Sequence, residues 1–64
     1  MIIINGNNLQ EEQIILMKFL KSNHYDFTKI AVEKNGVIVP RKEYDSEVFI
    51  DGDIIEIVQF VGGG

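Results

Sequence analysis

The apolar residues at the start of the chain follow the pattern of a short strand. Residues 1–4 form an apolar, largely β-branched run, and Asn5-Gly6 then supplies the residue types that a tight hairpin turn requires. Leu9 and Gln10 fit the beginning of a short return strand. The pattern therefore predicts a buried first strand that leads into a hairpin.

A helical spacing of apolar residues follows between Glu12 and Ser22. Leu16, Phe19 and Leu20 fall on one side of such a helix, with Ile15 and Met17 at its margins, whereas the lysines of this segment fall on the other side. Acidic residues open the segment and the lysines lie late in it, which suits the helix dipole. We predict a helix of about three turns that buries Leu16, Phe19 and Leu20.

A second hairpin is predicted in the middle of the chain. Residues 30–34 and 37–39 are rich in β-branched residues and flank Asn35-Gly36, a pair typical of type I′ turns because both central residues need positive φ. Pro40 has no backbone N–H to donate, so the second strand should end there. A polar connection over residues 41–45 follows, with Tyr44 available to pack beneath it.

The last third of the chain predicts the central strand. Residues 48–50 fit a brief strand, residues 51–53 a tight turn, and residues 54–61 the longest β-rich segment of the chain. Hairpin, helix, hairpin and final strand together indicate an α+β protein of β-grasp architecture, with a mixed sheet of four to five strands packed on one helix. We expect residues 1–61 to form this domain and residues 62–64 to form a flexible glycine tail.

Side chains of the final strand should alternate between the two faces of the sheet. Ile55 and Ile57 share one face, whereas Ile54, Glu56, Val58 and Phe60 share the other, and the glutamate marks that second face as exposed. Apolar residues left exposed there indicate a docking surface for a partner. The alternative is that edge residues cover them or that they are scattered surface residues without a function.

Length, composition and net charge exclude several classes of function. With 64 residues the chain has room for one small core and little material for an enclosed active site, and without cysteine it offers no thiol chemistry of its own. A net charge of −4 with scattered basic residues argues against nucleic acid as a partner. We find no signal segment, membrane span, metal-ligand cluster or phosphate-binding loop, so we expect a cytoplasmic protein that binds no metal and no cofactor.

The three final glycines need an explanation other than stability. Glycine loses the most entropy on ordering and offers no side chain for packing. A backbone without Cβ atoms suits threading through a narrow channel, and a terminal carboxylate is ionised at neutral pH and able to attack the α-phosphate of ATP in another enzyme's site. Taken alone, Gly62, Gly63 and Gly64 are equally compatible with a frayed end.

Longer motifs favour a reactive C-terminal carboxylate over a frayed end. The chain resembles the thiamine-biosynthesis sulfur carriers of the ThiS type, which are ubiquitin-like β-grasp proteins, and the resemblance extends over essentially the whole chain. It is carried by these matching segments: Val32-Glu33-Lys34-Asn35-Gly36, Val39-Pro40-Arg41, Tyr44, Asp51-Gly52-Asp53, Ile55-Glu56-Ile57 and Phe60-Val61-Gly62-Gly63-Gly64. It is loose in the helix, where Glu11-Glu12-Gln13 replaces the usual Thr or Ser at the start.

The resemblance implies a carrier that is not itself an enzyme. An ATP-dependent adenylating enzyme would activate the carboxylate of Gly64, a sulfur donor such as a cysteine desulfurase would supply the sulfur of a thiocarboxylate, and thiazole synthase would receive it. Gly62 and Gly63 would fit the channel of the activating enzyme, and Phe60 and Val61 would lie where the tail meets its partners, with Val58 and Ile54 on the same docking face.

Two other functions fit the same residues. The small subunit of molybdopterin synthase has a similar fold and a diglycine end but would use its thiocarboxylate within a stable enzyme complex. The shortness of the chain and its Phe60-to-Gly64 ending favour the thiamine pathway. A non-catalytic β-grasp interaction module, in which the tail has no chemical role, is the second alternative.

Overall fold

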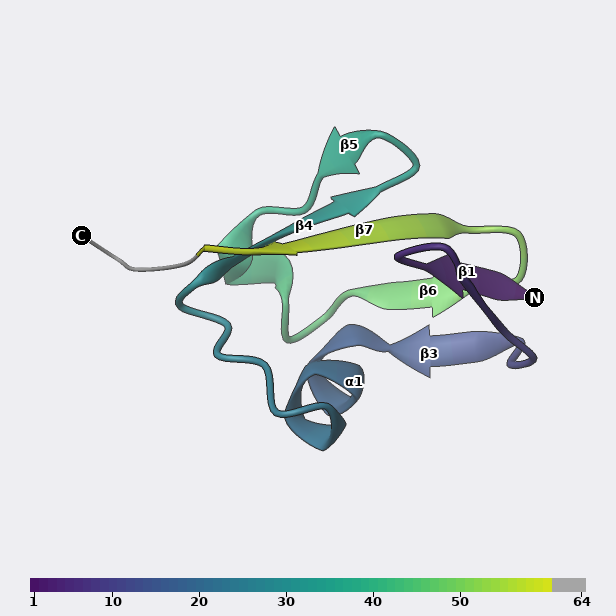
Figure 1. Cartoon of the computed structure of the whole chain (residues 1–64), viewed down its shortest axis with the longest axis horizontal. Coiled ribbons are helices and arrows are strands. Elements are labelled where there is room, and N and C mark those ends of the chain that lie inside the picture. The colour runs from purple at the N-terminus through teal and green to yellow at the C-terminus, as the bar shows by residue number, and fades with distance from the viewer. Residues whose placement is uncertain (61–64) are drawn as a thin grey trace.

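A five-stranded mixed sheet forms one layer of the protein, in the strand order β2-β1-β7-β4-β5 (Figure 1). The computed structural model describes residues 1–60. The strands of this sheet are β1 (Ile2–Ile4), β2 (Asn7–Leu9), β4 (Ile30–Lys34), β5 (Val37–Ile38) and β7 (Ile54–Gln59). β1 and β7 run parallel and the other neighbouring pairs run antiparallel. The predicted central position of the final strand is confirmed.

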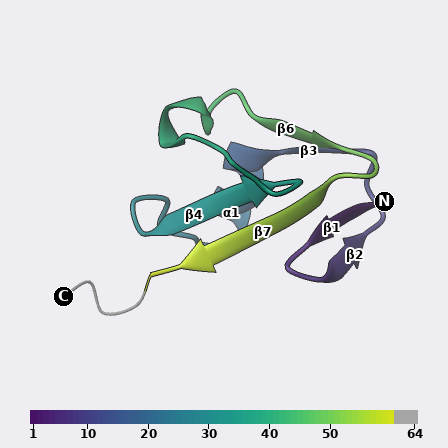
Figure 2. The ribbon, with the colours of Figure 1, turned by 90° about the horizontal axis from the view of Figure 1, so that it is seen from above.

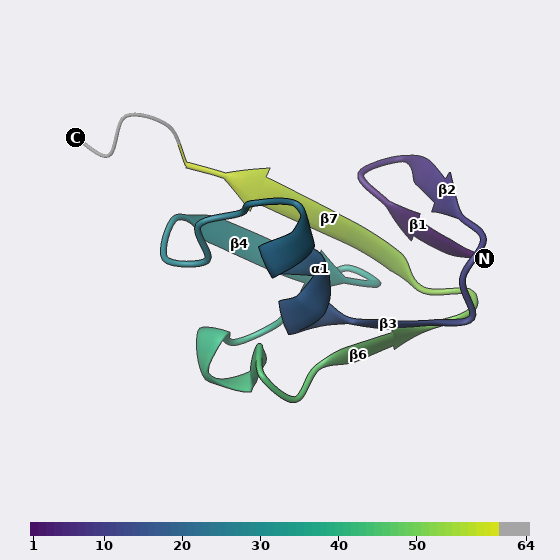
Figure 3. The same ribbon diagram turned by 90° about the horizontal axis from the view of Figure 1, so that it is seen from below.

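The second layer lies on one side of this sheet. It contains the helix α1 (Leu16–Ser22) and a two-stranded antiparallel sheet of β3 (Gln13–Ile15) and β6 (Val48–Ile50) (Figure 3). A 3-10 turn, η1 (Arg41–Glu43), occupies the predicted polar connection after Pro40. One helix against a mixed sheet is the β-grasp arrangement that the sequence predicts.

The helix begins later than predicted. Residues 13–15 pair with β6 instead, so that Ile14 lies opposite Phe49 and is buried. The backbone N–H of Leu16 then donates to the carbonyl of Glu47 at 3.1 Å, and the helix starts there with about two turns. The predicted start at Glu12 was wrong because two consecutive β-branched isoleucines gain more from pairing with β6 than from a helical turn.

Burial follows the predicted core with one exception. Leu16 and Leu20 are fully buried, whereas Phe19 is half-buried and its ring stacks on that of Tyr25 at the edge of the core. The apolar core joins residues from both layers: Ile2, Ile4, Ile14, Leu16, Leu20, Ile30, Val32, Val39, Tyr44, Phe49, Ile55 and Ile57. Tyr44 is 3% exposed, so its predicted packing beneath the connection is confirmed.

Both Asn-Gly pairs form the predicted turns. Asn5 and Gly6 have φ of 51° and 81°, and Asn35 and Gly36 have φ of 53° and 84°, as type I′ turns require. The return strand after the first turn is Asn7–Leu9, two residues earlier than Leu9 and Gln10 suggested. Asn5 also fastens its turn to the central strand, since its side-chain oxygen accepts from Ile57 N at 2.7 Å and its amide donates to Ile57 O at 3.2 Å.

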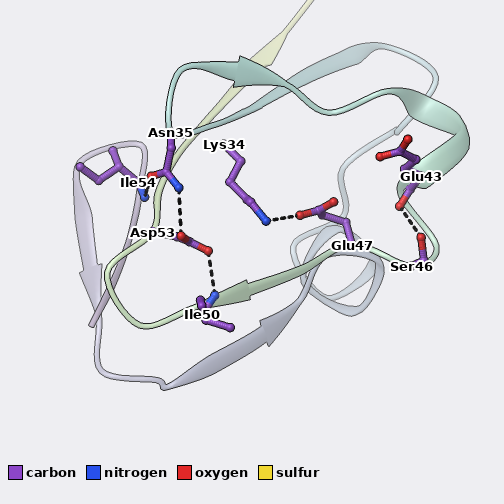
Figure 4. Close-up of polar contacts among 8 residues, drawn as sticks. All are labelled: Lys34, Asn35, Glu43, Ser46, Glu47, Ile50, Asp53 and Ile54. Atoms are coloured by element: carbon purple, nitrogen blue, oxygen red, sulfur yellow. Dashed lines mark hydrogen bonds and ion pairs between the residues drawn. The ribbon is translucent and has the colours of Figure 1, made fainter.

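The turn before β7 is held by a buried carboxylate. Asp53 accepts hydrogen bonds from the Asn35 side-chain amide at 3.0 Å and from the backbone N–H of Ile50 at 2.9 Å, and Asn35 in turn accepts from Ile54 N at 2.9 Å (Figure 4). Burial alone would raise the pKa of Asp53. The two hydrogen bonds and the nearby positive charge of Lys34 outweigh that effect and hold the pKa below its usual 3.8.

Replacing this carboxylate should cost stability in a pH-dependent way. In Asp53→Asn one amide hydrogen must face a donor, so we expect a loss of about 1–3 kcal/mol in the free energy of unfolding at neutral pH. Because the folded-state pKa of Asp53 is lowered, its contribution is present above 3.8 and disappears as the pH falls through the folded-state pKa. Denaturant unfolding of the wild type and the variant should therefore converge at acid pH. A gap that stays constant, or an equal loss in the exposed control Asp45→Asn, would contradict this role.

Candidate functional site

The final strand presents two chemically different faces. Ile55 and Ile57 are 0% and 6% exposed, whereas Ile54, Val58 and Phe60 are 51%, 54% and 54% exposed. The predicted alternation of faces is therefore confirmed. β7 lies between β1 and β4, so its outward side chains stand in the middle of the sheet surface and not at its edge (Figure 2).

We define the open face as the surface of the five-stranded sheet that points away from α1. The strand register places Ile3 opposite Ile54, Ala31 opposite Val58, and both Ile38 and Glu56 opposite Glu33. The residues on this face are Ile3, Asn8, Ala31, Glu33, Ile38, Ile54, Glu56, Val58 and Phe60. Within residues 1–60 no helix covers it, because α1 packs on the other side (Figure 1). It is an apolar surface that contains two carboxylates.

The end of the central strand is anchored to the body of the protein. The backbone N–H of Phe60 donates to the carbonyl of Lys29 at 2.8 Å, which holds the residue after β7 against the segment that precedes β4. The predicted end of the strand at Val61 was wrong: β7 ends at Gln59, and Phe60 follows it outside the strand. Val61, Gly62, Gly63 and Gly64 lie outside the described residues, so the roles predicted for them stay predictions.

A groove on the helical side was missed by the sequence analysis. It has a volume of about 640 Å³ and lies where α1, β3 and the end of β2 meet, with Leu9, Ile14 and Phe19 among its lining residues and Glu11 and Lys18 beside them. Residues 13–15 contribute to its lining as strand β3, whereas the sequence predicted them to be part of the helix. None of the predicted site residues lines it.

Two residues with basic side chains, His24 and Arg41, lie in exposed turns. His24 follows α1 with φ of 59°, and Arg41 approaches the carbonyl of Thr28 at 3.5 Å from η1. Over residues 1–60, no three potential metal ligands among His, Asp and Glu gather in one place. In that part of the chain no helix has the length and apolar character to cross a membrane.

Comparison with known proteins identifies the family. The sulfur carrier protein ThiS of Bacillus subtilis is 32% identical over 66 residues, a match that covers 100% of both chains. The crystal structure of the thiamine biosynthesis protein (ThiS) from Geobacter metallireducens superposes with a TM-score of 0.75 at 27% identity, covering 98% of this chain and 97% of that one.

A longer enzyme contains a similar segment. A thiazole synthase of Paramagnetospirillum magneticum is 51% identical over 39 residues, which cover 61% of this chain but only 12% of the enzyme. The model of the ThiS family matches residues 2–64, which includes the final glycines. The chain therefore belongs to the ThiS family.

Proposed function

We propose that this chain carries sulfur as a thiocarboxylate on Gly64 and delivers it for thiazole formation in thiamine biosynthesis. The observation that carries the proposal is the match to the ThiS family, which extends through the glycine tail to Gly64. The full-length similarity to the Bacillus sulfur carrier supports the same role. The chain is a carrier on which partner enzymes act, and not a catalyst.

The chemistry takes place at the terminal carboxyl group. In an adenylating enzyme a carboxylate oxygen of Gly64 attacks the α-phosphate of ATP, and pyrophosphate leaves. Sulfide then attacks the acyl carbon, the C–O bond to AMP breaks, and a thiocarboxylate remains. A cysteine desulfurase is a suitable sulfur source; if it supplies a persulfide, the acyl disulfide formed first must be cleaved by a thiol. The chain has no cysteine that could attack the activated carboxyl group itself.

The glycine tail suits a nucleophile that must enter another protein. Four residues beyond Phe60 can extend the chain end by at most about 14 Å. Gly62 and Gly63 carry no Cβ and fit a narrow channel, and Val61 joins them to the anchored end of β7. Residues 1–61 thus serve as the folded domain and residues 62–64 as the reactive tail.

The open face supplies the docking surface in this proposal. Ile54, Val58 and Phe60 are each about half exposed; the first two lie on β7, and Phe60 follows that strand directly on the way to the tail. An apolar surface of this kind on a small protein favours association with a partner. Binding there would direct the glycines into the partner's active site.

The similarity to a thiazole synthase favours the thiamine pathway over the molybdopterin alternative. A 39-residue segment of that enzyme is 51% identical in sequence to this chain. The Bacillus relative is a ThiS protein. We therefore propose an adenylating enzyme and thiazole synthase as successive partners. Both the use of ATP and the proposed partners support a cytoplasmic site of action.

Reconstitution with the acceptor enzyme tests the pathway. Thiocarboxylated chain should support thiazole formation when thiazole synthase and its other substrates are added, and the unmodified carboxylate form should not. The same thiocarboxylated chain should give no molybdopterin with a molybdopterin synthase large subunit. Sulfur transfer to molybdopterin alone would favour the alternative, and an interaction module would give neither product.

A further inference from the structure

Two glutamates stand directly opposite each other on the open face. The antiparallel register of β4 and β7 pairs Glu33 with Glu56. The Cβ atoms of residues so paired lie about 5 Å apart on the same side of a sheet. Glu33 is half-buried and Glu56 is exposed. The two carboxylates therefore share one small area of this surface.

The described part of the chain does not neutralise this pair. The ion pairs within residues 1–60 are those of Lys34 with Glu47 and of the terminal amino group with Asp51. Lys34 follows Glu33 in sequence but points to the opposite face, where its hydrogen bond to Glu47 raises its pKa above the usual 10.5 (Figure 4). Like charges directly opposite each other destabilise a sheet, so Glu33 and Glu56 weaken the free protein.

Apolar side chains surround the two carboxylates. Ile54 and Val58 flank Glu56 along β7 on the same face, and Ile38 lies beside Glu33 on β5. These three residues are 51%, 54% and 57% exposed. A partner that covers the apolar residues must also cover the carboxylates and remove water from them. Such burial is favourable only if the partner provides a positive charge.

We propose that Glu33 and Glu56 together receive one basic side chain from the adenylating enzyme, while Ile38, Ile54 and Val58 contact apolar residues around it. The identity of the partner rests on the proposed function. Arginine fits best, because its planar guanidinium group has five N–H donors and is able to bridge two carboxylates. The pair thereby adds charge selectivity to an otherwise apolar docking surface.

Stability and binding should change in opposite directions when this pair is altered. In Glu33→Gln, Glu56→Gln and the double variant, the repulsion is lost, so the thermal midpoint of the free protein should rise by about 2–5 °C. Each single change removes the repulsion, so the double variant should gain little more. The Kd for the adenylating enzyme should increase at least about tenfold in the double variant, with a weaker dependence on salt concentration.

A charge inversion makes the test sharper. In Glu56→Lys the new ammonium group would neutralise Glu33 within the chain, so this variant should be more stable than the wild type and should bind the enzyme least well. Glu12→Gln is the matched control, because Glu12 is exposed and lies before β3, outside the open face. It should change neither the thermal midpoint nor the Kd.

The possible results separate this inference from the proposed function. If the wild-type chain is bound and adenylated and the Gln variants bind equally well, the role of the glutamate pair is overturned and the carrier role stands. Gln variants that are less stable than the wild type would also overturn it, since the carboxylates would then support the fold. Failure of the wild type to bind or to be adenylated would overturn both the inference and the carrier role.

Discussion

Deletion of Gly64 should abolish thiocarboxylate formation while leaving the fold intact. The deletion leaves unchanged the core and the sheet that the structure describes for residues 1–60. It moves the terminal carboxylate by about 3.5 Å relative to Phe60, and a displacement of about 1 Å is enough to cost a factor of about 100 in rate. Intact mass after incubation with adenylating enzyme, ATP and sulfide should show no incorporation of sulfur.

A second variant separates carboxylate position from channel width. Gly64→Ala keeps the carboxylate at its normal place in the chain but adds a Cβ, so it should retain measurable activity if the position of the carboxylate matters most. Circular dichroism should be unchanged for both variants. Normal sulfur incorporation into the chain that ends at Gly63 would contradict the role of Gly64.

A charge at Phe60 should have the second largest effect. Phe60 is 54% exposed on the open face, and the hydrogen bond that anchors it to Lys29 uses only its backbone N–H. Phe60→Glu should therefore change the free energy of unfolding by less than about 0.5 kcal/mol. Binding to the adenylating enzyme should weaken by about 10- to 100-fold, because exposed aromatic residues supply much of the energy of docking surfaces and the new carboxylate would lose its water in place of an apolar ring.

Ile50→Glu provides the control for this experiment. Ile50 is 58% exposed but lies on β6 in the second layer, so a charge there tests for a general effect of net charge. Calorimetric titration with the adenylating enzyme should give a normal Kd for this control. Unfolding of Phe60→Glu would show that the ring stabilises the sheet, and an unchanged Kd would exclude Phe60 from the docking surface.

Local signals in the sequence predicted most of the sheet. Asn5-Gly6 and Asn35-Gly36 predict their turns because both residues of each pair accept positive φ, and the alternation along β7 identifies its buried face. Local signals could not predict the start of the helix. Ile14 and Ile15 fit a strand and a helix equally well, and only their pairing with β6, more than thirty residues later, decides between them.

The candidate site depends on both local and long-range features. The outward positions of Ile54, Val58 and Phe60 follow from the period of a strand and were predicted. The pairing of Glu33 with Glu56 follows from the register between β4 and β7, which no local pattern specifies. Glycines have no side chain to pack, so the role of Gly64 was predicted from chemistry and family resemblance. The family is confirmed, and the chemistry is a proposal.

The position of sulfur on the chain tests the proposed carrier role most directly. The wild-type chain is incubated with adenylating enzyme, ATP and a sulfur donor, and its intact mass and C-terminal fragments are then measured. We predict a mass increase equal to the replacement of one oxygen by sulfur, located at Gly64 and dependent on ATP. An unchanged mass under these conditions, or sulfur located at any other residue, would contradict the carrier role.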